Sequence, residues 1–225
     1  MTTWRVEGRQ VRATVKAGEG TAHISVSAVN PQVLRFQAAL DEGQIEAGAQ
    51  VVELEAAEKE GELVVWTPAV ELRLSGEPLG LVFRNAAGQV LLDAGASDEG
   101  RAGGVSLGTN RSAQLTFATA PNEHFYGLGE RYNALDQRGM RVQNWIQDVA
   151  ASLGDASYVC VPFYISSRGY GLWLNSVLPS VWDFGATESR TGRVFVRDSR
   201  LDMYLIYGPE PRAILDRFTE LRGRP

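Results

Sequence analysis

Aromatic, amide and acidic side chains gather in one segment, residues 125–148, which reads FYGLGERYNALDQRGMRVQNWIQD. At its end, Trp145, Gln147 and Asp148 place an indole ring, an amide and a carboxylate close together in the sequence. An aromatic ring offers an apolar face to the C–H side of a sugar, and amides and carboxylates bond its hydroxyl groups. These residues therefore indicate a carbohydrate-binding loop, although polar aromatic loops also occur in proteins that bind no sugar.

The beginning of the same segment is expected to be structural. It starts as a strand and breaks at Gly127 and Gly129, where we expect positive φ angles or a close approach of another backbone. Glu130 and Arg131 follow directly and are expected to form an ion pair that fixes this turn. The sequence assigns no role to two further residues, Tyr132 and Arg141.

Few residues are available for other chemistries. Cys160 is the single cysteine, so a disulfide within the chain is excluded, and His23 and His124 are the two histidines. We therefore expect no transition-metal site, no catalytic thiol and no cofactor. Cys160 lies in an apolar run and is expected to be a small buried hydrophobic residue.

The charge and hydropathy of the chain narrow the classes of partner. The formal net charge is −5, which argues against nucleic acid or an anionic membrane as a partner. The chain has no run of eighteen apolar residues that would span a membrane and no apolar stretch after Met1 that would form a signal peptide. We therefore expect a cytoplasmic protein.

Apolar and polar residues alternate in short runs on both sides of the segment at 125–148, and alternation with a period of two is the main signal of a strand. Polar stretches containing glycine, proline or asparagine separate the runs. The expected strands are residues 11–16, 22–29, 33–39, 63–67, 69–74, 79–83, 90–92, 115–119, 161–166, 170–176, 181–184, 193–197 and 203–207.

One segment alone has the spacing of a helix. Residues 210–222 carry Ile214, Leu215, Phe218 and Leu221 at helical intervals, with prolines near the start and a glycine after the end. Many strands and no alternating helices predict an all-β fold, a large antiparallel sandwich of two sheets with one C-terminal helix. We expect the sandwich to occupy residues 1–208, and the helix with the start of a linker to occupy residues 209–225.

Three sequence blocks are distinctive: FYGLGER from Phe125, VPFYISSRGYGLWLNS from Val161 and PRAILDRFTELRGRP from Pro211. They resemble glycoside hydrolase family 31, which contains α-glucosidases and α-xylosidases. In order and spacing they are similar to the N-terminal β-sandwich domain of that family. The resemblance implies a galactose-mutarotase-like sandwich, followed in the parent enzyme by a (β/α)8 barrel that carries both catalytic aspartates.

The resemblance also implies a role for the loop. In this family, a loop of the N-terminal domain reaches over the barrel and its aspartate contacts substrate hydroxyls. Asp148 matches that aspartate, Gln147 stands where the family commonly has arginine, and Trp145 matches the preceding aromatic residue less closely. Because glutamine removes a cation and a bidentate donor, the substrate preference is left open.

The chain alone is expected to be an inactive accessory domain of an α-glycosidase. Asp202 is followed by methionine, as the family's nucleophile is, but no tryptophan precedes it, so we interpret it as a strand residue on the solvent face. The expected partners are an α-glycoside and the barrel, and without the barrel the domain should expose an apolar surface and self-associate weakly.

Two other functions remain open. One is a free-standing carbohydrate-binding module. The other, a mutarotase-like enzyme, ranks last because it needs a histidine paired with a carboxylate, and neither His23 nor His124 has an obvious partner in the sequence.

Overall fold

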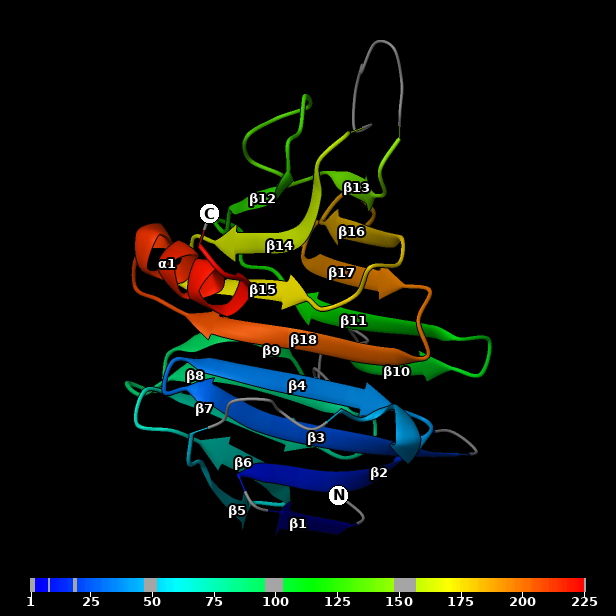
Figure 1. Ribbon diagram of the computed structural model, residues 1–225, viewed down its shortest axis with the longest axis vertical. Helices are drawn as coiled ribbons and strands as arrows, with labels where there is room; N and C mark the ends of the chain where they lie inside the picture. The colour runs from blue at the N-terminus through cyan, green and yellow to red at the C-terminus, as the bar shows by residue number, and fades with distance from the viewer. Residues whose placement is uncertain are drawn as a thin grey trace.

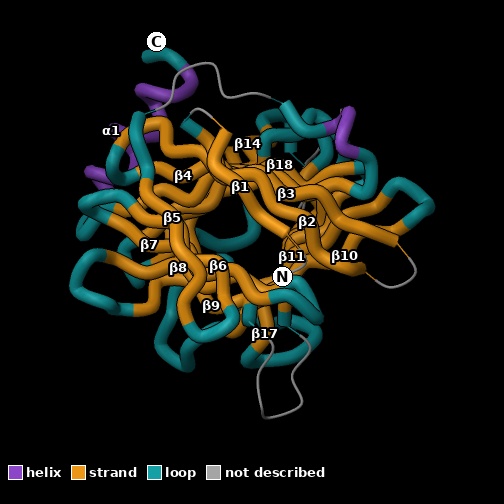
Figure 2. The backbone as a smooth tube through the Cα atoms, turned by 90° about the horizontal axis from the view of Figure 1, so that it is seen from below, coloured by secondary structure: helices purple, strands orange, loops and turns teal. Residues whose placement is uncertain are grey.

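The computed structural model describes residues 3–7, 9–17, 20–46, 52–95, 103–147 and 157–224. Two antiparallel sheets of eight and ten strands face each other as two layers (Figures 1 and 2). One helix, α1 (Pro211–Arg222), follows the last strand. The predicted all-β sandwich with a C-terminal helix is therefore confirmed. No helix among the described residues has the length and apolar content needed to cross a membrane.

The eight-stranded sheet joins both ends of the chain. In spatial order its strands are β1 (Thr3–Glu7), β2 (Gln10–Ala17), β3 (Gly20–Asn30), β4 (Val33–Ala39), β18 (Arg200–Tyr207), β15 (Tyr170–Leu174), β14 (Cys160–Ser166) and β12 (Phe125–Gly129). The last strand of the chain thus lies in the middle of the sheet, between an early strand and a late one.

The ten-stranded sheet is built mainly from the middle of the chain. Its order is β13 (Arg141–Asn144), β16 (Ser180–Phe184), β17 (Thr191–Val196), β11 (Ser112–Ala118), β9 (Val90–Ala94), β8 (Gly80–Asn85), β7 (Val70–Ser75), β6 (Glu62–Trp66) and β5 (Glu55–Lys59), and β10 (Gly104–Gly108) also pairs with β11. The sequence did not predict β1, β5, β10 or β13, because their apolar residues are few or do not alternate over five positions.

The inner faces of the two sheets form one continuous apolar core. Alternate strand residues enter it, so that in β18 Leu201, Met203 and Leu205 are fully buried. Several aromatic rings fill the end near β12, where the rings of Phe125 and Phe184 stack with centroids 4.5 Å apart. This core is what the period of two in the sequence encodes.

A second apolar cluster lies on the outer face of the eight-stranded sheet, under α1. Ile214 of the helix is fully buried against this face, and the ring of Phe218 stacks on Phe163 of β14 at 4.0 Å. Most of the helix's apolar residues therefore pack on the sandwich, while Leu215 remains exposed.

The interpretation of Asp202 as a solvent-face residue is wrong. Asp202 does point to the outer face of the sheet, but it is only 2% exposed. Arg35 of β4 donates to both of its carboxylate oxygens, at 2.9 and 2.6 Å, and Asn175 donates to it at 2.8 Å. Because neighbouring segments cover this outer face, Asp202 is as buried as the apolar residues of β18 that point into the core.

This burial predicts that Asp202→Ala is strongly destabilising. Removing the Asp202 carboxylate leaves the buried Arg35 guanidinium with only the half-exposed Glu46 as a charge partner. Breaking a buried pair in this way typically costs about 3–5 kcal/mol in the free energy of unfolding. Urea denaturation measures the effect. The matched control is Glu188→Ala, because its pair with Arg193 is largely exposed, and there we expect a loss of about 1 kcal/mol or less. A similarly small loss for Asp202→Ala would mean that its carboxylate is solvated.

Candidate functional site

The predicted sugar-binding segment begins where the two sheets meet at one end of the molecule (Figure 1). β13 pairs with β16 at the edge of the ten-stranded sheet, and the chain then leaves that edge through Trp145 and Gln147. The amide of Gln147 donates to the carbonyl of Ser157 at 3.1 Å, which ties this strand to the segment before β14. Trp145 and Gln147 are both exposed, and Asp148 lies outside the described residues.

Arg131 anchors the base of this segment. Its guanidinium donates to the carbonyl of Leu128 at 3.0 Å, to the carbonyl of Gln143 at 3.3 Å and to the side chain of Asn144 at 2.5 Å. Glu130 instead accepts a hydrogen bond from the hydroxyl of Tyr132. Arg131 therefore holds the turn through carbonyl and amide partners that connect β12 to β13, the strand before Trp145, and not through the predicted ion pair with Glu130.

The two glycines of this turn meet the conditions that the sequence predicted. Gly127 and Gly129 have φ angles of 133° and 89°. A Cβ at Gly129 would lie 2.0 Å from the carbonyl oxygen of Val159, so a side chain there is excluded by the neighbouring backbone as well.

An open depression of about 1030 Å³ lies beside Trp145, over the outer face of the eight-stranded sheet and next to α1. Trp173 forms part of its wall, stacked on Tyr204 at 4.6 Å and covered by the guanidinium of Arg222 at 4.9 Å. The other lining residues are Glu46, Asn144, Ile146, Cys160, Val161, Pro162, Asn175, Ser176, Val177, Leu178, Asp198, Arg200 and Phe218. Aromatic, amide and charged groups thus line one surface.

Cys160 is part of this depression, so the expectation that it is a buried hydrophobic residue is wrong. It is only half-buried, and its Sγ lies 3.6 Å from a guanidinium nitrogen of Arg131. The apolar run around it indicated burial, but β14 turns its start towards the surface between the loop and the helix.

A network of charged groups supports one side of the depression. Glu46 accepts hydrogen bonds from Arg35 at 2.8 Å and is paired with Arg200 at 2.6 Å. The hydrogen bonds from the two arginines lower the pKa of Glu46, and partial burial opposes this effect only in part. Because Arg35 also binds Asp202, the network ties the segment before residue 47 to the middle of the sheet. Nothing in the sequence predicts this network except the presence of two charged residues, Arg35 and Asp202, in otherwise apolar strands.

His124 has a carboxylate partner, contrary to the sequence interpretation. His124 directly precedes β12, and its Nδ1 lies 2.6 Å from a carboxylate oxygen of Asp136. Both side chains are partly exposed. Burial would raise the pKa of Asp136, but hydrogen bonds from the amide of Arg138, from His124 and from the amide of Phe125 lower it overall. The pair is a histidine oriented by a carboxylate, and it does not line the depression.

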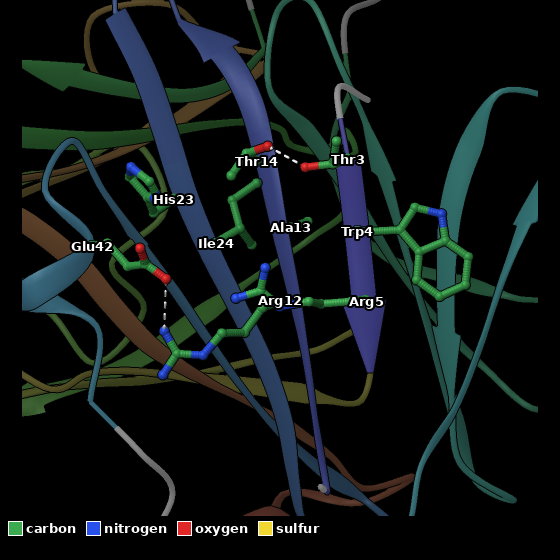
Figure 3. Close-up of a pocket in the computed structure, with 9 residues that line it drawn as sticks. All are labelled: Thr3, Trp4, Arg5, Arg12, Ala13, Thr14, His23, Ile24 and Glu42. Atoms are coloured by element: carbon green, nitrogen blue, oxygen red, sulfur yellow. Dashed lines mark hydrogen bonds and ion pairs between the residues drawn. The ribbon is translucent and has the colours of Figure 1, made fainter. Parts of the chain in front are cut away.

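His23 lies at a smaller hollow of about 140 Å³ beside the edge strand β1 (Figure 3). It is half-buried rather than freely solvated. Arg12 in this hollow is already neutralised, since it lies 3.1 Å from Glu7 and 3.7 Å from Glu42. The indole of Trp4 points away from these polar groups, towards the core. No group of three or more histidine, cysteine or acidic residues that could hold a metal ion occurs within the described part of the chain.

Comparison with known proteins identifies the domain family. The family model described as the glycosyl hydrolase 31 N-terminal galactose mutarotase-like domain matches residues 23–183. The α-xylosidase of Emericella nidulans is 38% identical over 105 residues, which are 46% of this chain and 13% of that protein. The α-xylosidase of Lactiplantibacillus pentosus is 34% identical over 102 residues, which are 45% of this chain and 13% of that protein.

Solved structures share the fold over nearly the whole chain. The cycloalternan-forming enzyme of Listeria monocytogenes, solved with a pentasaccharide substrate, aligns with a TM-score of 0.87 and 21% identity, over 99% of this chain and 22% of that one. The dextranase of Flavobacterium johnsoniae, solved with isomaltotriose, aligns with a TM-score of 0.81 and 18% identity, over 97% of this chain and 27% of that one. The matched regions are thus only 13% of the two α-xylosidases and 22% and 27% of the two solved structures.

The network beside the depression predicts a specific pH dependence. Because the pKa of folded Glu46 is lowered, its ionised form stabilises the fold above its ordinary pKa of about 4.5, and this contribution is lost as the pH falls through the lowered value. We therefore expect Glu46→Gln to be less stable than the native chain at pH 7, with a gap that narrows below about pH 4.5.

The measurement is urea denaturation of both proteins from pH 7 down to pH 3. The matched control is Glu58→Gln, an exposed glutamate of β5 in the other sheet. A gap for Glu46→Gln that stays constant across this range would contradict the role of the ionised carboxylate.

Proposed function

Because this chain belongs to the family of glycosyl hydrolase 31 N-terminal galactose mutarotase-like domains, we propose that it is the accessory domain of a retaining α-glycosidase. Its parent acts on an α-glucoside or an α-xyloside, and the names of the sequence relatives support both substrate types. The catalytic carboxylates lie in a (β/α)8 barrel outside this chain, and this domain supplies a loop that binds substrate.

The observation that carries the proposal is the position of Trp145. It is 46% exposed, it lines the depression, and it follows β13, a strand that Arg131 ties to β12. A rigid base with an exposed aromatic tip is suited to holding a sugar ring at a fixed place. Gln147 and Asp148 come next in the chain, so their amide and carboxylate supply hydrogen bonds to the hydroxyl groups.

The barrel docks over the depression. Exposed apolar side chains surround it, among them Ile146, Leu178 and Val177, the last of which is 97% exposed. Contacts between domains of one chain typically bury about 600–1,500 Å², and apolar patches of a few hundred Å² rarely remain uncovered. In the isolated chain this surface gives weak self-association.

A free-standing carbohydrate-binding module is the alternative, and the exposed indole of Trp145 also suits it. The two functions differ in what the isolated chain does. A free-standing module binds oligosaccharides through Trp145 without help, whereas an accessory loop binds them only together with the barrel.

The role of Asp148 is tested in the parent protein. A carboxylate that accepts hydrogen bonds from a sugar contributes about 1.5–3 kcal/mol, so Asp148→Ala should lower kcat/KM for an α-glycoside by about tenfold or more. We expect the melting temperature to change little, because the proposed role of this carboxylate is to bind substrate.

Glu58→Ala is the matched control, since it removes an exposed carboxylate from β5, which lies at the opposite edge of the ten-stranded sheet from β13. Unchanged catalysis in Asp148→Ala would leave Asp148 as a solvated loop residue. A collapse of stability would show that it holds the loop together instead.

A further inference from the structure

Trp66, Glu71 and Arg84 form a row across the outer face of the ten-stranded sheet. Trp66 of β6 lies opposite Glu71 of β7, which lies opposite Arg84 of β8. Their sequence neighbours Val65, Leu72 and Phe83 point into the core, so these three side chains point outward. Since neighbouring strands lie about 4.8 Å apart, the row spans roughly 10 Å.

Arg84 has a buried donor that the protein leaves unused. Its Nε is shielded from solvent and has no hydrogen-bond partner among the described residues. The Nε of Arg12 is likewise buried without a hydrogen-bond partner among the described residues. It lies 3.1 Å from a carboxylate oxygen of Glu7, however, so its charge is paired. An unsatisfied buried donor is costly and needs an explanation, and an acceptor supplied by a bound ligand is one such explanation.

The other two members of the row are held in place. Arg73 donates to one carboxylate oxygen of Glu71 at 2.7 Å, which orients the carboxylate. The ammonium of Lys59 lies 4.5 Å from the centre of the Trp66 ring, a cation–π contact that restrains the indole. Trp66 itself lines the hollow beside the row, whereas Lys59 does not.

The row and Arg73 border an open hollow of about 290 Å³. This volume is close to the smallest volumes of ligand sites in proteins, which span about 300–1,000 Å³. Its remaining lining residues are Thr67, Val70, Asn85, Ala86 and Gly88. Six charged residues in and around the hollow balance, three cationic and three acidic: Lys59, Arg73, Arg84, Glu60, Glu62 and Glu71. Balanced charge favours a neutral ligand over an anion.

We propose that this hollow is a second carbohydrate-binding site, which takes one or two rings of a neutral α-linked gluco-oligosaccharide. The sugar packs its C–H face on Trp66, Glu71 accepts a hydrogen bond from a hydroxyl group, and Arg84 donates to a ring or hydroxyl oxygen. The choice of sugar rests on the proposed function. The site itself is separate from the Trp145 loop, because β6 and β13 lie towards opposite ends of the sheet order (Figure 1).

The experiment is a nuclear magnetic resonance titration of the isotopically labelled chain with maltotriose and with isomaltotriose. We expect the indole N–H signal of Trp66 and the amide signals of β6, β7 and β8 to shift with a common dissociation constant. Arg84→Gln should weaken binding about tenfold, and Trp66→Ala should weaken it at least as much. Trp145→Ala is the matched control and should leave these shifts unchanged.

Several results would overturn the proposal: no shift near Trp66 with either sugar, shifts confined to Trp145, or full binding by Arg84→Gln. Inorganic phosphate is the comparison ligand, and a response of Arg84 to phosphate but to neither sugar would also overturn it. If Trp66→Ala fails to fold, Arg84→Gln and Glu71→Gln carry the test, because both side chains lie on the surface face. Failure here leaves the Asp148 measurement untouched, so the two proposals can fail separately.

Discussion

The pairing of β18 with β4 on one side and β15 on the other is the constraint on which the rest of the structure depends. It joins the first and last parts of the chain in one sheet, and it brings Arg35 and Asp202 together although 167 positions separate them. Closing so long a loop costs entropy, which burial on both faces of β18 must offset. Its inner face fills the core, and its outer face carries the charged network and supports α1.

The Arg35–Asp202 pair has a physical consequence for this pairing. A buried ion pair adds little net stability, because desolvation offsets most of the attraction between the charges. A shift of β18 by one residue would, however, point Asp202 into the apolar core and separate it from Arg35. We therefore interpret the pair as a device that specifies register. The same network holds Glu46 and Asn175 beside the depression, so the register of β18 also sets the shape of the surface next to Trp145.

The sequence predicted the sandwich and the helix because both depend on local periodicity. It failed where burial depends on distant segments. Asp202 was predicted to face solvent because it alternates with the apolar residues of its strand. In the structure, α1 and the segment ending at Glu46 cover that outer face of the sheet. His124 contacts Asp136, and the pattern of strands in the sequence does not predict that these two residues are neighbours. Trp145 was predicted as a ligand-facing residue and does line the depression, whereas the Trp66–Glu71–Arg84 row emerges only once the strand register is known.

We propose that this domain contributes to glycoside hydrolysis only together with a separate catalytic domain. The most direct measurement is the turnover of an aryl α-glycoside by three samples: this chain, the remainder of the parent protein, and the two produced together. We expect no turnover by this chain alone and substantially more by the combined halves than by the remainder alone. Turnover by this chain that is abolished by substitution of one of its own carboxylates would contradict the proposed role, and so would a remainder that is fully active without this domain.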